Sequence, residues 1–233
     1  QARERSQGYL KDSIYGAIDG AVTTFAVVSS VAGAGLNSGI VIILGLANLL
    51  ADGFSMASGN FLGTRAENQA ARKARREEAD EIEAHPEGER EEIRQIFANK
   101  GFEGETLEKV VDVITSDKER WIDTMMQEEH GLSRDRPSAI RAALATFVAF
   151  LIIGGIPLAP YIVDLVDESI LGNPFWPACL LTGIAFFADG ALKSRFVDQH
   201  CALGGAETLG VGALAAGMAY AIGYLLRPFA EGL

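Results

Sequence analysis

Paired glutamates are the residues of this sequence best suited to chemistry. Glu78 and Glu81 lie three positions apart, and Glu89 and Glu92 repeat that spacing, so each pair would project from one face of a helix. Two such faces packed together would gather four carboxylates, which could bind a divalent cation. The alternative is an ordinary solvated face, on which these acids pair with neighbouring lysines and arginines. The spacing alone leaves both interpretations open.

A second group of donor atoms lies in the stretch MMQEEHGL. Met125 and Glu129 are one helical turn apart, and Met126 and His130 directly follow them. Oxygen ligands beside thioethers suit a borderline ion such as Fe²⁺ better than Mg²⁺ or Ca²⁺ alone. Taken by themselves, the two methionines are more typical of a hydrophobic core.

A third group of polar residues lies in apolar sequence. Asp19 interrupts the run IYGAIDGAVTTFAVVSSV, and a later stripe with four-residue spacing contains Asn48, Asp52, Met56 and Asn60. An ionised group in a bilayer costs at least ~2.5–3.5 kcal/mol, so it is retained where it faces a cavity, an ion or a partner. A carboxylate beside the Met56 thioether would make a transient divalent-cation site. The alternative for Asp19 or Asp52 is a hydrated position near the membrane surface.

Five apolar stretches must position these residues. Each has about 20 residues or more, enough to cross a hydrocarbon core, and they cover residues 14–35, 39–63, 139–160, 174–193 and 206–226. Residues 65–136 hold 20 of the 31 acids and 13 of the 20 bases. The sequence therefore predicts an all-α polytopic membrane protein with five transmembrane helices and a helical insert between the second and third spans.

Three parts of the chain follow from this pattern. Residues 1–64 form the N-terminal tail and the first two spans, residues 65–136 the helical insert, and residues 137–233 the last three spans. Within the insert, breaks at His85-Pro86, at Lys100-Gly101 and at residues 115–117 predict three or four helices. The first of these is expected to continue the second transmembrane helix without a break.

The positions of basic residues predict the orientation. Lysines and arginines favour the cytoplasmic ends of spans, and here they lie before the first span, in the insert and after the fourth span: Arg3, Arg5, Lys11, Lys193 and Arg195 outside the insert. The insert is therefore expected to be cytoplasmic. Asp189, four residues before Lys193, is interpreted as part of a local ion pair or a water contact.

Charge and motif content exclude several function classes. A net charge of −11 argues against nucleic acid or an anionic lipid surface as a partner and favours cations. No GxxxxGK[ST] loop is present, so ATP is not expected to drive this chain. No serine-histidine or cysteine-histidine arrangement supports an enzyme, no prosthetic group is predicted, and Cys179 and Cys201 do not indicate a disulfide framework.

Long stretches of the sequence match a known family in order. They read DGAVTTFAVVSSVAGAG, GLANLLADGFSMASG, EIEAHPEGEREEI, MMQEEHGL and ALKSRFVDQH, and in these the chain resembles the vacuolar iron transporter family. The resemblance implies a homodimer with an ion path near the dimer interface and a cytoplasmic metal-binding domain. It implies that Asp19 and Met56 line the path. It also implies a ligand set in the insert of Glu78, Glu81, Glu89, Glu92, Met125, Met126 and Glu129.

One residue departs from the family pattern. Family members often have SMxxGE where this chain has SMASGN, so Asn60 replaces a carboxylate. That puts in question a role of position 60 in binding metal or protons at the cytoplasmic mouth of the ion path.

The small-residue pairs Gly16/Gly20 and Gly59/Gly63 would permit the close helix contact that a dimer needs.

These observations favour a secondary transporter that exports Fe²⁺, with Mn²⁺, Co²⁺ or Zn²⁺ as further substrates, in exchange for protons. The antiport is implied by the resemblance. The expected surroundings are membrane lipid in a bacterial inner membrane, favoured by short loops and a small insert, or in a vacuolar membrane if the source is eukaryotic. The rival hypothesis is a membrane-anchored metal sensor or sequestering protein, in which the insert binds metal and the spans only hold it in place.

Overall fold

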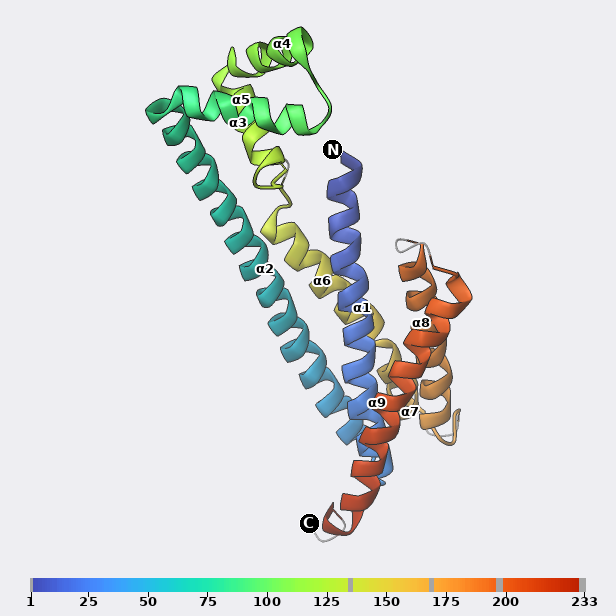
Figure 1. Cartoon of the computed structure of the whole chain (residues 1–233). Helices are drawn as coiled ribbons and strands as arrows, with labels where there is room; N and C mark the ends of the chain where they lie inside the picture. Colours follow the sequence, from blue (N-terminus) through green and yellow to red (C-terminus); the bar gives the residue numbers. More distant parts are fainter. Residues whose placement is uncertain (1, 134–135, 168–169, 196–198, 231–233) are drawn as a thin grey trace. The chain divides into compact units, whose positions relative to one another are not determined.

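The computed structural model describes residues 2–133, 136–167, 170–195 and 199–230, and in these it contains helices and no strand. Figure 1 shows their arrangement. The α-helices are α1 (Ala2–Gly33), α2 (Ser38–Ala84), α3 (Pro86–Asn99), α4 (Gly104–Thr115), α5 (Lys118–Glu128), α6 (Ala139–Gly154), α7 (Ala159–Val166), α8 (Phe175–Ser194) and α9 (Cys201–Ala230). A 3₁₀ turn, η1 (Ile156–Leu158), separates α6 from α7.

The chain divides into two compact units. Residues 63–138 form one, called here the inserted unit, and residues 2–62 with 139–233 form the other, called here the membrane unit. Each has its own apolar core. The core of the membrane unit includes Phe25, Phe150 and Phe186, and that of the inserted unit includes Ile93 and Trp121.

Five helical stretches are long and apolar enough to cross a membrane, which confirms the predicted number. They are Gly8–Gly33, Ser38–Ala84, Ala139–Val166, Phe175–Ser194 and Cys201–Phe229. The third is not one continuous helix, because α6 ends at Gly154 and η1 carries Pro157 in its first turn. Proline has no amide hydrogen to donate and its ring clashes with the preceding turn, so the helix breaks there.

The helix boundaries of the inserted unit agree with the predicted breaks. The second span continues without interruption to Ala84, and α3 starts at Pro86, where a proline fits the first turn of a helix. α3 ends before Gly101, whose φ of 92° suits glycine. Asp117 caps α5 by accepting a hydrogen bond from the Arg120 amide at 2.8 Å.

Glycines bring α1 and α6 together within the membrane unit. A Cβ atom added at Gly16 would lie 2.5 Å from the Thr146 carbonyl oxygen, and one at Gly20 would lie 2.6 Å from the Phe150 carbonyl oxygen. The close contact expected of this glycine pair is therefore present, but its partner is α6 of the same chain, and the expectation that the pair serves a dimer is wrong. Around Gly59 and Gly63 nothing lies within 4 Å of an added Cβ.

Candidate metal site

Five glutamates from three helices gather in the inserted unit. Glu78 and Glu81 lie on α2, Glu89 and Glu92 lie on α3, and Glu129 directly follows α5. Glu89 interacts electrostatically with Glu81, Glu92 and Glu129, and Glu78 interacts with Glu89 and Glu129. The two paired faces seen in the sequence thus meet in the fold, and Glu129 joins them.

His130 completes the tightest part of this cluster. One ligand atom each from Glu78, Glu129 and His130 can be chosen so that all lie within 4.8 Å of one another. The His130 Nε2 atom lies 3.5 Å from Glu78 Oε2. His130 belongs to the group of donor atoms in MMQEEHGL, but the ligand set implied by the family resemblance does not include it. Its position depends on how α5 ends against α2, which spacing along the chain does not reveal.

Two carboxylates of the cluster are buried, and each has one oxygen atom without a hydrogen-bond partner among the described residues. The Glu78 side chain is 1% exposed, and Glu89 is also buried. Glu78 Oε1 and Glu89 Oε2 have no hydrogen-bond partner among the described residues. A buried carboxylate with an unpaired oxygen is costly, and a bound cation would supply the missing partner. The donor set of carboxylate oxygens and one imidazole fits a borderline divalent ion.

The crowding of these acids changes how readily they lose protons. The pKa of Glu78 is raised from 4.5 to about 7, first by burial and then by the charges of Glu89 and Glu129, against an opposing contact with His130. The pKa of Glu89 is also raised, first by burial and then by the charges of Glu92, Glu81 and Glu129. A cation at this position would favour the ionised form of both groups.

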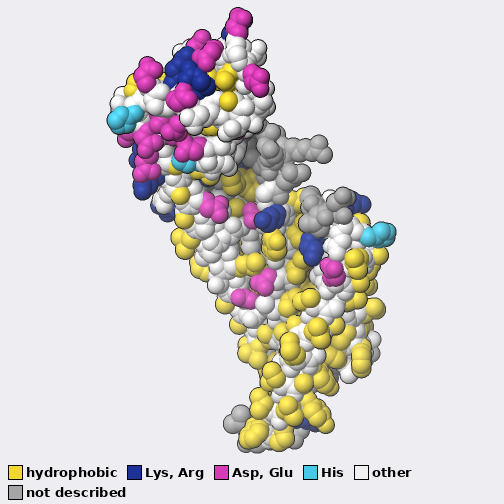
Figure 2. Space-filling view, in the orientation of Figure 1, with side chains coloured by type: hydrophobic (Ala, Val, Ile, Leu, Met, Phe, Trp, Pro, Cys, Tyr) yellow, Lys and Arg dark blue, Asp and Glu magenta, His cyan; other side chains and the backbone are white. Residues whose placement is uncertain are grey.

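Several basic residues of the inserted unit pair with other acids. Arg75 contacts Glu119 at 2.6 Å and Asp123 at 2.5 Å, and Arg94 contacts Glu108 at 2.8 Å. In the part of the chain that the structure describes, none of the five clustered glutamates forms an ion pair with a lysine or arginine. Figure 2 shows acids and bases together over this unit. Because the lysines and arginines pair with other acids, the five clustered glutamates do not behave as an ordinary solvated face.

The two methionines lie in the apolar core of the inserted unit. Met125 is fully buried and Met126 is 6% exposed, and both pack in the cluster that contains Ile93 and Trp121. The Glu129 amide donates a hydrogen bond to the Met125 carbonyl oxygen at 2.9 Å, so the last turn of α5 fixes the glutamate relative to the core. Whether either thioether binds an ion stays a prediction.

The polar residues of the membrane unit face one another. Asp19 on α1 interacts electrostatically with Asp52 on α2, and both side chains are half-buried. Met56 packs against the core of the membrane unit. The Asn60 Nδ2 atom donates a hydrogen bond to Thr146 Oγ1 on α6 at 2.7 Å. The stripe on α2 is therefore directed toward α1 and α6.

Comparison with known proteins identifies the family. Residues 10–224 match the model of the VIT family. This chain belongs to the VIT family. It is similar to the vacuolar iron transporter of Toxoplasma gondii, with 34% identity over 95% of this chain and 76% of that protein. It also resembles vacuolar iron transporter 1 of rice, Oryza sativa subsp. japonica, with 32% identity over 91% and 82%. For vacuolar iron transporter 1 of Arabidopsis thaliana the identity is 30% over 94% and 86%.

The family predicted from the sequence motifs is confirmed. The matched residues of this VIT-family chain include both Asp19 in the membrane unit and the glutamate cluster of the inserted unit. The two sets of residues therefore lie within the part of the chain shared with the family.

Proposed function

We propose that this chain is a secondary transporter that moves Fe²⁺, with Mn²⁺, Co²⁺ or Zn²⁺ as further substrates, out of the cytoplasm in exchange for protons. The relatives named above, vacuolar iron transporters, support a metal substrate. The observation that carries the proposal is the cluster of five glutamates, which among the described residues pairs with no lysine or arginine and holds two buried carboxylate oxygens without a hydrogen-bond partner. Such a cluster suits a cation substrate.

In this proposal the inserted unit collects the ion and the membrane unit moves it. The ligand set is Glu78, Glu81, Glu89, Glu92 and Glu129 with His130, and Met125 and Met126 are further candidates. Carboxylates that bind a divalent ion must be ionised, so protons compete with the metal. The inserted unit would thus hold metal at neutral pH and release it on acidification.

Asp19 would carry the ion through the membrane unit. Its carboxylate faces Asp52, and the two charges repel unless a cation or a proton lies between them. A divalent ion would exchange part of its water shell for these oxygens and for the Met56 thioether. When the ion leaves, protons would neutralise the carboxylates, which is the means of coupling.

The orientation and assembly are part of the same proposal. The basic residues support a cytoplasmic position for the inserted unit, in a bacterial inner membrane or a vacuolar membrane. A homodimer with the ion path near its interface would use a face of α2, where Gly59 and Gly63 leave open space. Gly16 and Gly20 would take no part, since α6 covers them.

The test compares transport with binding in the full-length chain. Purified protein in liposomes with an acidic interior and the inserted unit facing outward should accumulate Fe²⁺. Asp19→Asn keeps the size and polarity of the side chain but removes its charge, so uptake should collapse while calorimetric binding by the inserted unit persists. Glu67→Gln, an exposed change on α2 outside both sites, is the control.

Either of two results would overturn the proposal. If correctly inserted Asp19→Asn protein takes up Fe²⁺ at the parent rate, Asp19 is not on the path. If the parent protein itself binds Fe²⁺ but moves none, the chain is a membrane-anchored metal sensor or sequestering protein instead.

A further inference from the structure

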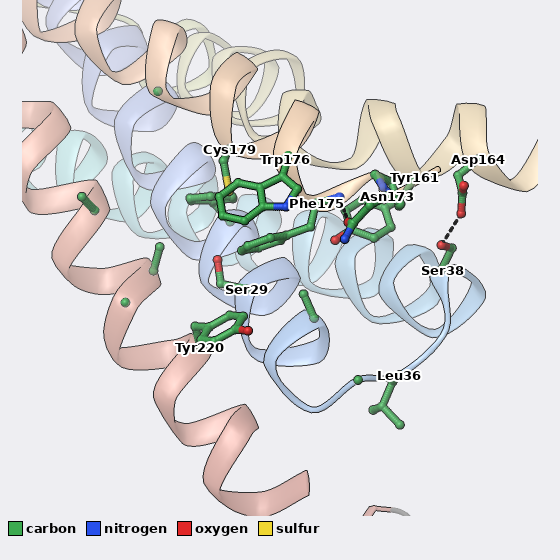
Figure 3. A pocket seen from close by; sticks show the side chains of 18 of the residues that line it. Ser29, Leu36, Ser38, Tyr161, Asp164, Asn173, Phe175, Trp176, Cys179 and Tyr220 are labelled. Atoms are coloured by element: carbon green, nitrogen blue, oxygen red, sulfur yellow. Dashed lines mark hydrogen bonds between the residues drawn. The ribbon is translucent and has the colours of Figure 1, made fainter. Parts of the chain in front are cut away.

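A cavity opens at one end of the membrane unit, away from the residues assigned to metal. This end, called here the far end, is where α1 stops at Gly33 and α2 starts at Ser38. The cavity has a volume of about 860 Å³ and is lined from α1, α7, α8 and α9. Figure 3 shows Phe175 and Trp176 near its centre, with Ser29 and Tyr220 beside them. At the rim Ser38 Oγ donates a hydrogen bond to Asp164 Oδ2 at 2.5 Å.

The floor of the cavity is an aromatic pair. Phe25 on α1 and Phe186 on α8 both line it, and their ring centroids lie 6.4 Å apart in an edge-to-face arrangement. One turn from this pair toward the far end, the hydroxyl oxygens of Ser29 and Thr182 are buried and have no hydrogen-bond partner among the described residues. Unpaired buried hydroxyls beside a roomy cavity are suited to ordered water. Water can therefore reach the level of the floor from the far end.

Asp189 lies on the other side of that floor. It follows Phe186 by three residues on α8 and shares the inward face on which Thr182 and Ala185 are buried. Asp189 Oδ2 is buried without a hydrogen-bond partner among the described residues. Lys193 does not pair with Asp189 among the described residues, so of the two contacts expected for Asp189 the ion pair is absent and the water contact stays a prediction. A carboxylate in this position is poorly solvated unless it binds a proton.

Among the described residues, no ion pair stabilises the Asp189 carboxylate. The elements packed against α8 are α1, α7, α9 and η1, and η1 has no charged residue. The other three helices carry one candidate acid each: Asp19 on α1, Asp164 on α7 and Glu207 on α9. Asp19 interacts with Asp52, and Asp164 accepts a hydrogen bond from Ser38. Glu207 is exposed and bonded to Gln199.

We propose that Asp189 is a proton-carrying carboxylate of the transport cycle, reached by water from the far end through this cavity and separate from the metal path at Asp19. A divalent ion needs several oxygen, nitrogen or sulfur ligands, and one carboxylate behind two phenyl rings does not supply them. A proton needs only the carboxylate and a water molecule that can pass the rings. The inference rests on the proposed exchange of metal for protons, in which the far end faces away from the cytoplasm.

The experiment separates proton coupling from metal movement in full-length protein in liposomes. Uptake of Fe²⁺ driven by a pH gradient requires protons, whereas exchange of radioactive Fe²⁺ for unlabelled Fe²⁺ without a gradient does not. Asp189→Asn should reduce gradient-driven uptake by about tenfold or more and leave the exchange rate unchanged. Asp189→Glu should keep both activities. Glu207→Gln, an exposed acid on the packed helix α9, is the matched control and should keep both.

A second variant tests the access route. Ala213 lines the cavity from α9, and Ala213→Trp should slow gradient-driven uptake without slowing exchange, because the indole fills the water space. If Asp189→Asn keeps parental gradient-driven uptake, or loses exchange in the same proportion, Asp189 does not carry the coupled proton. Parental uptake in Ala213→Trp would refute the cavity as the access route. If the parent exchanges Fe²⁺ but shows no gradient-driven uptake, proton exchange itself is wrong, and this inference fails with it.

Discussion

Glu78 illustrates how one side chain can link stability to metal binding. It is almost completely buried and lies near two other acids, so its ionised form is disfavoured in the metal-free fold. Metal would reverse that preference by supplying a positive charge. The metal-free fold therefore disfavours the ionised carboxylate of Glu78, and a bound cation would remove this penalty. The penalty comes from the position of Glu78 in the fold and not from its residue type.

The inserted unit should lose stability as pH rises in the absence of metal. The pKa of Glu78 is about 7 in the folded state and 4.5 without the fold, so between these values the folded state binds more protons than the unfolded state. The free energy of unfolding should then fall from pH 4.5 to pH 8, by up to about 3 kcal/mol from this group. Thermal unfolding of residues 63–138, which have their own core, would measure it.

Two variants make this pH prediction specific. Glu78→Gln should flatten the pH dependence, because the titrating group is gone. Lys118 lowers the pKa of Glu83, an exposed neighbour on α2, so Glu83→Gln should leave the loss of stability at high pH in place. Saturating Zn²⁺ should restore stability at pH 8. A fragment equally stable at pH 5 and pH 8 would show that Glu78 is not the strained group.

His130 should decide which ions the cluster prefers. Imidazole favours Fe²⁺ and Zn²⁺ over Mn²⁺, so His130→Ala should weaken Zn²⁺ binding by about tenfold, or ~1.4 kcal/mol, and weaken Mn²⁺ binding much less. Titration calorimetry of the full chain measures both affinities. His85, which lies between α2 and α3 and is exposed, provides the control variant His85→Ala. Equal losses for the two ions would mean that His130 does not bind the metal.

At the scale of elements, the close approach of α1 and α6 depends on glycine. An alanine Cβ at Gly16 would lie 2.5 Å from a backbone oxygen of α6, which cannot move away as a flexible side chain could. Gly16→Ala should therefore reduce the thermal stability of the detergent-purified chain. Gly210→Ala on α9 meets nothing within 4 Å in this chain and should be tolerated. Equal melting temperatures for both variants would contradict the packing described for α1.

The elements show which features the sequence can predict. The helix breaks at Pro86 and Gly101 were predictable because proline and glycine affect the backbone at their own positions. The spans were predictable because the length of an apolar run can be read directly from the sequence. The interruption at Pro157 was missed, since it lies inside an apolar run that is long enough to span. The partner of Gly16 was also missed, because small residues indicate close contact without naming the helix that makes it.

The candidate metal site likewise has features that the sequence predicts and features that it does not. Spacing predicted that Glu78 and Glu81 share a helix face, and likewise Glu89 and Glu92, because helical geometry is local. The burial of Glu78, the proximity of His130 and the unpaired Asp189 were not predictable, since each depends on which helices pack together. For Asp189 the sequence left an ion pair or a water contact open. The ion pair rested on the spacing from Lys193, and spacing permits a contact without requiring it.

At the scale of the whole molecule, one helix takes part in both the charged inserted unit and the apolar membrane unit. α2 contributes residues up to Leu62 to the membrane unit and those from Gly63 onward to the inserted unit. The proposed metal residues occur in both units, with Asp19 in one and Glu78 in the other. Binding and passage are thus assigned to different parts of the chain and should be separable by substitution.

The double variant Glu78→Gln with Glu89→Gln should separate supply from passage. Both glutamines keep the side-chain shape but remove the charges that hold the ion, so calorimetric binding by the inserted unit should weaken by about tenfold or more. Transport into liposomes should then be slow at low Fe²⁺ and approach the parent rate at high Fe²⁺, because ions can still reach Asp19 directly. The control is Glu83→Gln with Glu108→Gln, two exposed acids that pair with Lys118 and Arg94. Transport lost at every Fe²⁺ concentration, in protein that is still correctly inserted, would make the cluster an obligatory step of the passage rather than a store that feeds it.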